Sequence, residues 1–410
     1  MNSISDDGVT IGERLRALRL WRHMTLAEVA GLAGISAAYL SMAERGLRSV
    51  DRRSMISDLA AALRVSETEL TGGPHLGSDP EQSAPHSAIL ALRVALETSS
   101  LADPADCQAR PAADLAAELH AIKTLYYQRC DYVSVGERLP AVLDELHARG
   151  CASSSDADRR TARLLLVEAC ITAGFMAKDL GYLDLAHVAA LRADEAARAL
   201  GDPAALSKAT FLRFHTAPRE IKSWDRALAM ATRAAGTLEP HAHDTEAVSV
   251  LGLLTLSAGL AAAVLQRGPD MEHWLSESAA LAARVPDEMG CNWQSFCSTN
   301  VAIWRTSLAV ERGEAGGKIA ELARTVDERK ITTRTRQADF LVDVGRGVAR
   351  DPKAGADAVG WLHRAEATAP QRIRNYAPAR ETVAYLLTRA TATAGGRELR
   401  GMAARMGVPH

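Results

Sequence analysis

Apolar residues recur every three or four positions along most of this 410-residue chain, and the alternation typical of half-buried strands is missing. Alanine and leucine, which favour helices, fill many of these positions. The pattern therefore predicts an all-α protein without a sheet. Glycine, proline and serine interrupt it at residues 72–88, and a short amphipathic segment follows at residues 89–97. These breaks predict one domain at residues 1–72, a linker with a short helix at residues 73–110, and a second domain at residues 111–410.

The first domain contains five short segments with helical apolar spacing. Thr25 and Ser36 stand directly before two of these segments, where N-caps belong. Gly34 lies between the two and permits a left-handed turn, while Leu40 has the spacing of a core residue. The stretch "TLAEVAGLAGISAAYLSMAERGLRS" resembles the Xre family, whose fold is that of the lambda and 434 repressors. The resemblance implies a five-helix, lambda-repressor-like helix-turn-helix domain that binds a double-stranded DNA operator.

The arginines of this domain are clustered. The whole chain carries a formal net charge of −2, which excludes a globally basic nucleic-acid-binding protein. Residues 1–72 hold nine arginines and nine acidic residues, with four arginines at residues 11–23 and four at residues 45–53. Because these groups flank the expected reading helix on both sides, they predict a clamp on the DNA phosphates. Glu44 is expected to pair with an arginine rather than to contact a base.

The resemblance places the base-contacting positions on Ala37, Ala38 and Met42. None of these side chains donates a hydrogen bond, so contacts with thymine methyl groups are expected in place of bidentate hydrogen bonds to bases. Polar contacts to phosphate then come from residues around the helix and from helix N-termini. The predicted DNA-binding residues are Thr25, Ser36, Ala37, Ala38, Tyr39, Ser41, Met42, Arg45 and Arg48.

The second domain repeats itself. Six segments of similar apolar pattern begin at residues 134, 182, 224, 271, 314 and 353, and each follows another helix-length apolar segment. Such a period predicts stacked helical hairpins, an α-solenoid, ending in a helical cap at residues 376–406. Ala227, Ala231 and Ala234 after Trp224 are similar to the small residues in the second helix of a tetratricopeptide repeat. The resemblance implies a tetratricopeptide-like α-solenoid.

An Xre domain joined to such repeats resembles the Rgg/PlcR type of peptide-sensing, quorum-sensing regulators. In that type the concave face of the repeats holds a signalling peptide, largely through asparagines. This chain departs from the pattern, because it has four asparagines in all. The expected effector is therefore left open between a peptide and a small molecule.

The stretch "CNWQSFCSTNVAIWRT" concentrates aromatic residues in a chain that is 4% aromatic. Its spacing predicts one helix with two tryptophans, a phenylalanine and an asparagine on a single face. Two interpretations stay open: the rings fill the core between repeats, or they face a ligand. In the second, Asn300 holds an amide, and a carboxylate is bound by Arg305, Arg334, Arg336 or Gln337. The secondary aromatic candidates are "FLRFH" at residues 211–215 and "LYYQR" at residues 125–129, with the same two interpretations. The predicted ligand-binding residues are Trp293, Phe296, Asn300, Trp304, Arg305, Arg334 and Gln337.

Other chemistry is not predicted. The stretch at residues 313–318 lacks the first glycine and the final Ser or Thr of a phosphate-binding loop, and the six cysteines have no zinc-binding spacing. No enzyme activity, metal site or cofactor is expected.

The longest apolar run, residues 250–265, is shorter than the roughly 18 residues that span a bilayer, and the N-terminus has no signal-peptide pattern. We therefore expect a cytoplasmic protein without a membrane partner.

Together these features predict a transcriptional regulator, a homodimer whose operator binding is controlled by a ligand or partner on the helical repeats. The alternative is a repeat scaffold that recruits a protein partner, with the helix-turn-helix as a docking or dimerisation module.

Overall fold

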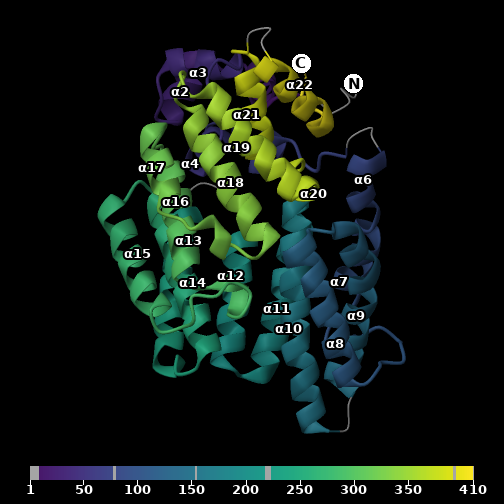
Figure 1. The fold of residues 1–410 in the computed structure, drawn as a ribbon. Helices are drawn as coiled ribbons and strands as arrows, with labels where there is room; N and C mark the ends of the chain where they lie inside the picture. The colour runs from purple at the N-terminus through teal and green to yellow at the C-terminus, as the bar shows by residue number, and fades with distance from the viewer. Residues whose placement is uncertain (1–8, 77–79, 153–154, 218–222, 391–393, 410) are drawn as a thin grey trace.

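The computed structural model describes residues 9–76, 80–152, 155–217, 223–390 and 394–409. Within these ranges every regular element is helical and no residue lies in a strand. The predicted all-α class is confirmed. Figure 1 shows the N-terminal helices at the top of the molecule, beside the C-terminal helices and above a large helical body.

The N-terminal domain has the predicted five helices. Its core is closed by fully buried leucines from four of them, including Leu15, Leu40, Leu59 and Leu70. The helices are α1 (Ile11–Trp21), α2 (Leu26–Leu32), α3 (Ala37–Glu44), α4 (Arg53–Leu63) and α5 (Glu67–Thr71).

Most of the predicted linker is folded and packed. A helix, α6 (Pro80–Ser87), occupies a stretch that the glycine and proline content predicts to be a loop, and residues 77–79 lie outside the described part of the chain. The buried His86 of α6 lies 3.1 Å from both the Tyr182 hydroxyl and Asn375 Oδ1. The predicted short helix is present as α7 (Ile89–Thr98) and buries its apolar side in the core of the body. Because α6 and α7 contribute to this packing, the region is more than a flexible tether.

The body is built of consecutive hairpins in two layers. Helices α10, α12, α14, α16 and α18 contact one another in order, and their hairpin partners cover them. All six predicted second helices are present, as α9, α11, α13, α15, α17 and α19. The helices are α8 (Ala112–Thr124), α9 (Tyr132–Ala152), α10 (Asp156–Asp179), α11 (Leu183–Leu200), α12 (Pro203–Thr216), α13 (Ser223–Leu238), α14 (Thr245–Val264), α15 (Gly268–Ala282), α16 (Ser298–Glu311), α17 (Gly317–Arg324), α18 (Arg334–Ala349), α19 (Gly355–Thr368), α20 (Pro370–Ile373), α21 (Ala377–Leu387) and α22 (Ala394–Met406).

Helix α14 corrects the length expected from its sequence. It runs unbroken for 20 residues through Ser257 and Gly259, and among the described residues it is the single helix long and apolar enough to cross a membrane. Its most apolar window is wholly buried inside the body. A helix that is apolar all round belongs in the interior of a large fold, and α14 has that place here.

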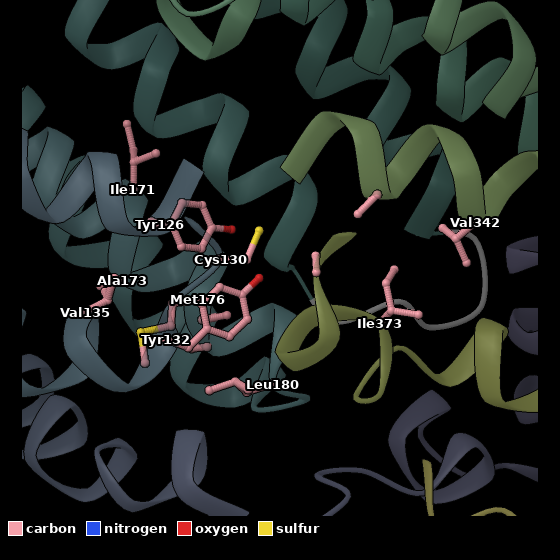
Figure 2. Packing of buried hydrophobic residues seen from close by; sticks show 14 of the residues in the cluster. Tyr126, Cys130, Tyr132, Val135, Ile171, Ala173, Met176, Leu180, Val342 and Ile373 are labelled. Atoms are coloured by element: carbon pink, nitrogen blue, oxygen red, sulfur yellow. The ribbon is translucent and has the colours of Figure 1, made fainter. Parts of the chain in front are cut away.

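The last helices of the body fold back onto the first. Figure 2 shows Tyr126 and Tyr132 beside Met176 and Leu180, with their hydroxyl groups pointing the same way. Both hydroxyls donate to Asp179 Oδ2, at 2.6 and 2.9 Å. Arg372 of α20 pairs with the same carboxylate and also with Asp339 of α18. The hairpins therefore form a closed body held by a buried ion-pair cluster.

Candidate nucleic-acid interface

Helices α2 and α3 form a tight turn of two helices. They are bent by 108° relative to each other, within the range of helix-turn-helix motifs. Gly34 has a φ of +67°, and Ile35 donates its backbone N–H to the Ala30 carbonyl at 2.9 Å. The predicted left-handed glycine is confirmed, and its conformation fixes the direction in which α3 leaves the turn.

Both predicted N-caps are present. The Thr25 hydroxyl accepts from the backbone N–H of Glu28, whose carboxylate accepts from the backbone N–H of Thr25 in return. The Ser36 hydroxyl accepts from the backbone N–H of Tyr39 at 3.1 Å and opens α3. These caps satisfy N–H groups that the first turns leave unpaired.

One side of α3 faces solvent. Ala37, Ala38, Arg45 and Arg48 are exposed, whereas Ser41 and Met42 are half-buried. The remaining predicted contact residue, Tyr39, turns inward, and its hydroxyl lies 3.3 Å from both the Ser49 carbonyl and the Met55 sulfur. The surface offered by α3 is therefore small and apolar at its start and basic beyond its end.

Two of the clustered arginines have structural roles. Arg19 donates Nε and Nη2 to the two carboxylate oxygens of Glu44, at 2.5 and 2.8 Å, which confirms the expected role of Glu44. Arg53 is turned away from α3 and pairs with Glu311 of the body at 2.6 Å. Arg45 and Arg48 are the exposed members of the second cluster. Fewer arginines can therefore contact DNA phosphates than the number of clustered arginines predicts.

The N-terminal domain is docked on the body through a buried ionic cluster. Arg346 of α18, whose side chain is fully buried, donates to the Asp51 carbonyl at 2.5 Å and pairs with Glu311 at 3.3 Å. Arg350 pairs with the Asp51 carboxylate at 2.9 Å. Arg53 donates its backbone N–H to Glu311 at 2.9 Å. The ends of α16 and α18 thereby hold the start of α4.

Glu381 of α21 forms a second docking contact. Its carboxylate accepts the backbone N–H groups of Ile11 and Val50, each at 3.3 Å. Burial raises the pKa of Glu381 to about 7, and the nearby carboxylates of Asp51 and Glu13 add to the rise. None of these docking contacts was expected from the sequence, because no local pattern links residues more than 250 positions apart.

The stretch predicted to be one aromatic helix is not a continuous helix, so the prediction from the spacing is wrong. Trp293–Ser295 is a 3-10 turn, Gln294 has a φ of +50°, and α16 starts at Ser298. The side chain of Asn292 fixes this loop by donating to the carbonyls of Pro286 and Phe296, at 2.8 and 2.7 Å. The four residues chosen by spacing therefore do not share one helix face.

These residues have separate environments. Phe296 is fully buried, and a Cβ on Gly252 of α14 would lie 1.9 Å from its ring, so that glycine makes room for it. Trp293 is half-buried and donates Nε1 to Glu168 at 3.0 Å. Asn300 and Trp304 lie one turn apart on α16, 1% and 9% exposed. Phe296 and Trp304 are thus both members of a buried hydrophobic cluster, and Trp293 packs against it.

The polar ligand candidates are also divided. Arg305 pairs with Glu272 of α15 at the surface, at 3.1 Å, away from the aromatic residues. Arg334 is exposed and Gln337 half-buried at the start of α18. Arg336 lies with its guanidinium 5.7 Å from the ring centre of Trp304. The structure brings Arg336, rather than Arg305, to the tryptophan.

Residues 10–71 match a family model described as a helix-turn-helix domain. This part of the chain is a helix-turn-helix domain by both geometry and sequence. It is 43% identical over 56 residues to the HTH-type transcriptional repressor RghR of Bacillus subtilis (strain 168), covering 14% of this chain and 42% of that protein. It is 36% identical over 72 residues to the uncharacterized HTH-type transcriptional regulator RghRB of the same organism, covering 17% and 52%. The chain thus spans about half of each relative, and no solved structure matches significantly.

Proposed function

We propose that the protein is a DNA-binding transcriptional regulator without enzymatic activity, cytoplasmic and homodimeric, whose operator binding is controlled by an effector on its helical repeats. The observation that carries the proposal is the exposed face of α3, held by two capped helices and a 108° turn in a domain that matches the helix-turn-helix family. The two relatives, described as a transcriptional repressor and a transcriptional regulator, support the same function.

Base recognition by this surface is mainly apolar. Ala37 and Ala38 stand exposed at the start of α3, where the N-terminal residues of a reading helix contact base edges. Methyl groups contact thymine but make no bidentate hydrogen bond, which is the contact worth about 1–3 kcal/mol of discrimination. Affinity then rests on phosphate contacts from Arg45 and Arg48 and on the groove shape of the operator.

Control by the body works through orientation. The docking contacts engage Ile11, Val50, Asp51 and Arg53, and they leave the start of α3 facing solvent. The docked body therefore does not cover the reading surface. It sets the angle at which each domain of a dimer meets DNA, where the two reading helices must lie about 34 Å apart. We assign the body to tetratricopeptide-like repeats that hold a peptide or small-molecule effector on the inner helices.

The proposal is tested by selecting binding sites from random duplex DNA with the full-length protein. The expected result is an enriched site with two half-sites about one helical turn apart, bound less tightly by the Arg45→Ala and Arg48→Ala variants. The absence of any enriched site, together with equal binding of random DNA by wild type and both variants, would instead favour a scaffold that uses the domain for docking.

A further inference from the structure

Four buried polar atoms without a hydrogen-bond partner belong to the first half of α16 and to the start of α18. They are Oδ1 of Asn300, Nε1 of Trp304, Oγ1 of Thr333 and Nε of Arg336. The residues Asn300 and Thr333 are 1% and 2% exposed, so bulk solvent does not reach them. An unsatisfied buried polar group costs about 1–3 kcal/mol, and native folds keep few of them. Four on the two neighbouring helices α16 and α18 indicate partners that bind from outside the chain.

Rings from several inner helices lie next to these atoms. Trp304 is 6.1 Å from the ring of His215, His215 is 4.6 Å from Phe211, and Phe211 is 5.4 Å from Trp293. His215 and Trp293 are half-buried, and the Arg336 side chain keeps 19% of its surface exposed. The group therefore combines aromatic rings with side chains that keep part of their surface in solvent.

The unpaired atoms define the chemistry of the missing partner. Arg336 and Trp304 each offer an N–H donor, and the donor of Arg336 is cationic. Asp339 binds the other side of the Arg336 guanidinium at 3.1 Å, and burial nevertheless lowers the pKa of Arg336. The oxygen of Asn300 needs a donor. A planar molecule with a carboxylate and one N–H or O–H group supplies partners for Arg336, Trp304 and Asn300.

We propose that the first half of α16 and the start of α18 bind a small aromatic carboxylate, with Arg336 and Trp304 donating to the acid group and Asn300 accepting from a donor on the ring. The inference rests on the proposed function, since it names the class of effector that the repeats hold. Phe211, His215 and Trp293 contact the ring of this molecule.

The same two helices carry the docking cluster at their other ends. Trp304 and Glu311 are seven residues apart on α16, and Arg336 and Arg346 are ten apart on α18, which is about 10 and 15 Å along a helix. A ligand that draws the two helix starts together changes their relative position as rigid bodies. Because Glu311 and Arg346 lie on these helices, a change in the relative position of α16 and α18 alters their contacts with the helix-turn-helix domain.

The direct test is calorimetric titration of the full-length protein with indole-3-acetate, which has a carboxylate and a ring N–H, and with the neutral indole-3-acetamide. The acid is expected to bind and the amide to bind at least tenfold more weakly. Arg336→Gln should weaken binding of the acid at least tenfold, whereas Arg329→Gln, which removes an exposed arginine elsewhere on the body, should not. No binding of the acid at millimolar concentration, or equal binding of acid and amide, overturns the proposal.

A second measurement does not need a ligand. Thr333→Val removes a hydroxyl that has no partner, so the Tm of the protein should stay unchanged or rise. Thr382→Val removes a buried hydroxyl that donates to the Pro378 carbonyl at 2.8 Å, and its Tm should fall. A fall of Tm for Thr333→Val as large as that for Thr382→Val would show a structural role and contradict the proposal.

Regulation is read out separately, as the affinity of the selected DNA with and without indole-3-acetate. If the acid binds and DNA affinity changes, both proposals stand. If the acid binds and the protein selects no DNA site, the ligand site stands and the proposed function fails. If the protein selects a DNA site and does not bind the acid, the proposed function stands and the ligand site fails.

Discussion

Glu311 holds Arg53 by two bonds: its carboxylate accepts the backbone N–H at 2.9 Å and the guanidinium at 2.6 Å. Glu311 is 1% exposed, and it also pairs with the buried Arg346. One carboxylate at the end of α16 therefore neutralises two arginines from different parts of the chain. The position of the DNA-binding domain on the body depends on this side chain.

Glu311→Gln should loosen the docked domain. Removing one partner of a buried ion pair costs about 3–5 kcal/mol, because the remaining charge is left without compensation. We expect faster hydrogen exchange in α1 and α4, with exchange in α10 and α12 unchanged. Glu314→Gln is the matched control, since that residue lies three positions further along the chain, just beyond α16, and pairs with Lys318 at the surface. Equal exchange of α4 in both variants would contradict the docking role.

Glu381 should make stability depend on pH. Its pKa is about 7 in the folded protein, above the usual 4.5, so folding favours the protonated form. The free energy of unfolding is then greatest below pH 4.5 as far as this group is concerned. It should decline by on the order of 3 kcal/mol as the pH rises to about 7, and change little above that.

The check is chemical denaturation between pH 5 and 8. Glu381→Gln cannot titrate, so its profile should lose most of this decline. A profile that is the same for the wild type and Glu381→Gln over this range would exclude the assigned pKa, because the buried His75 titrates identically in both.

Arg45 and Arg48 should contribute salt-dependent affinity. Each phosphate contact adds about 0.9 to the slope of log affinity against log salt, so Arg45→Ala and Arg48→Ala should each lower that slope by about one. The loss should be similar for specific and random DNA. Arg329→Ala, an exposed arginine of the body, should leave the slope unchanged.

Two glycines of the helix-turn-helix domain should respond in opposite directions to alanine. A Cβ on Gly12 of α1 would lie 2.3 Å from the carbonyl oxygen of Ala43, a backbone atom that cannot turn aside. Gly12→Ala should cost about 1–3 kcal/mol by forcing α1 from α3. Gly31 has open space in α2, and Gly31→Ala should gain about 0.5–1 kcal/mol from helix propensity. Thermal unfolding measures both, and a neutral Gly12→Ala would show that the helices adjust.

Local patterns were sufficient for much of the fold. The caps at Thr25 and Ser36, the turn at Gly34 and the six second helices follow from spacing and side-chain chemistry within one or two turns. The pairing of Glu44 was also predicted, because an acidic residue inside a basic cluster needs a nearby partner. Such features depend on neighbours in sequence, which is why they can be read without a structure.

The errors arose where the decisive contact was distant in sequence. Aromatic spacing predicts a helix at Trp293, but this segment is a loop. The Asn292 amide donates to the Phe296 carbonyl, and the absence of a Cβ on Gly252 lets the Phe296 ring pack in the core. Pro85 made α6 look like a loop, although burial of His86 against Asn375 accompanies that helix. The arginine cluster at residues 45–53 predicts that Arg53 contacts phosphate. Its guanidinium instead pairs with Glu311, which is 258 residues away in the sequence.

The ion pair between Asp179 and Arg372 joins residues 193 positions apart and ties the last hairpins to the first. In an open array of repeats each unit contacts only its neighbours, so the ends can unravel one repeat at a time. A body joined at this point cannot fray from an end without breaking the joint. It should unfold as a single cooperative unit, and it should fold slowly for a helical protein, because ordering the long intervening chain must precede the closing contact.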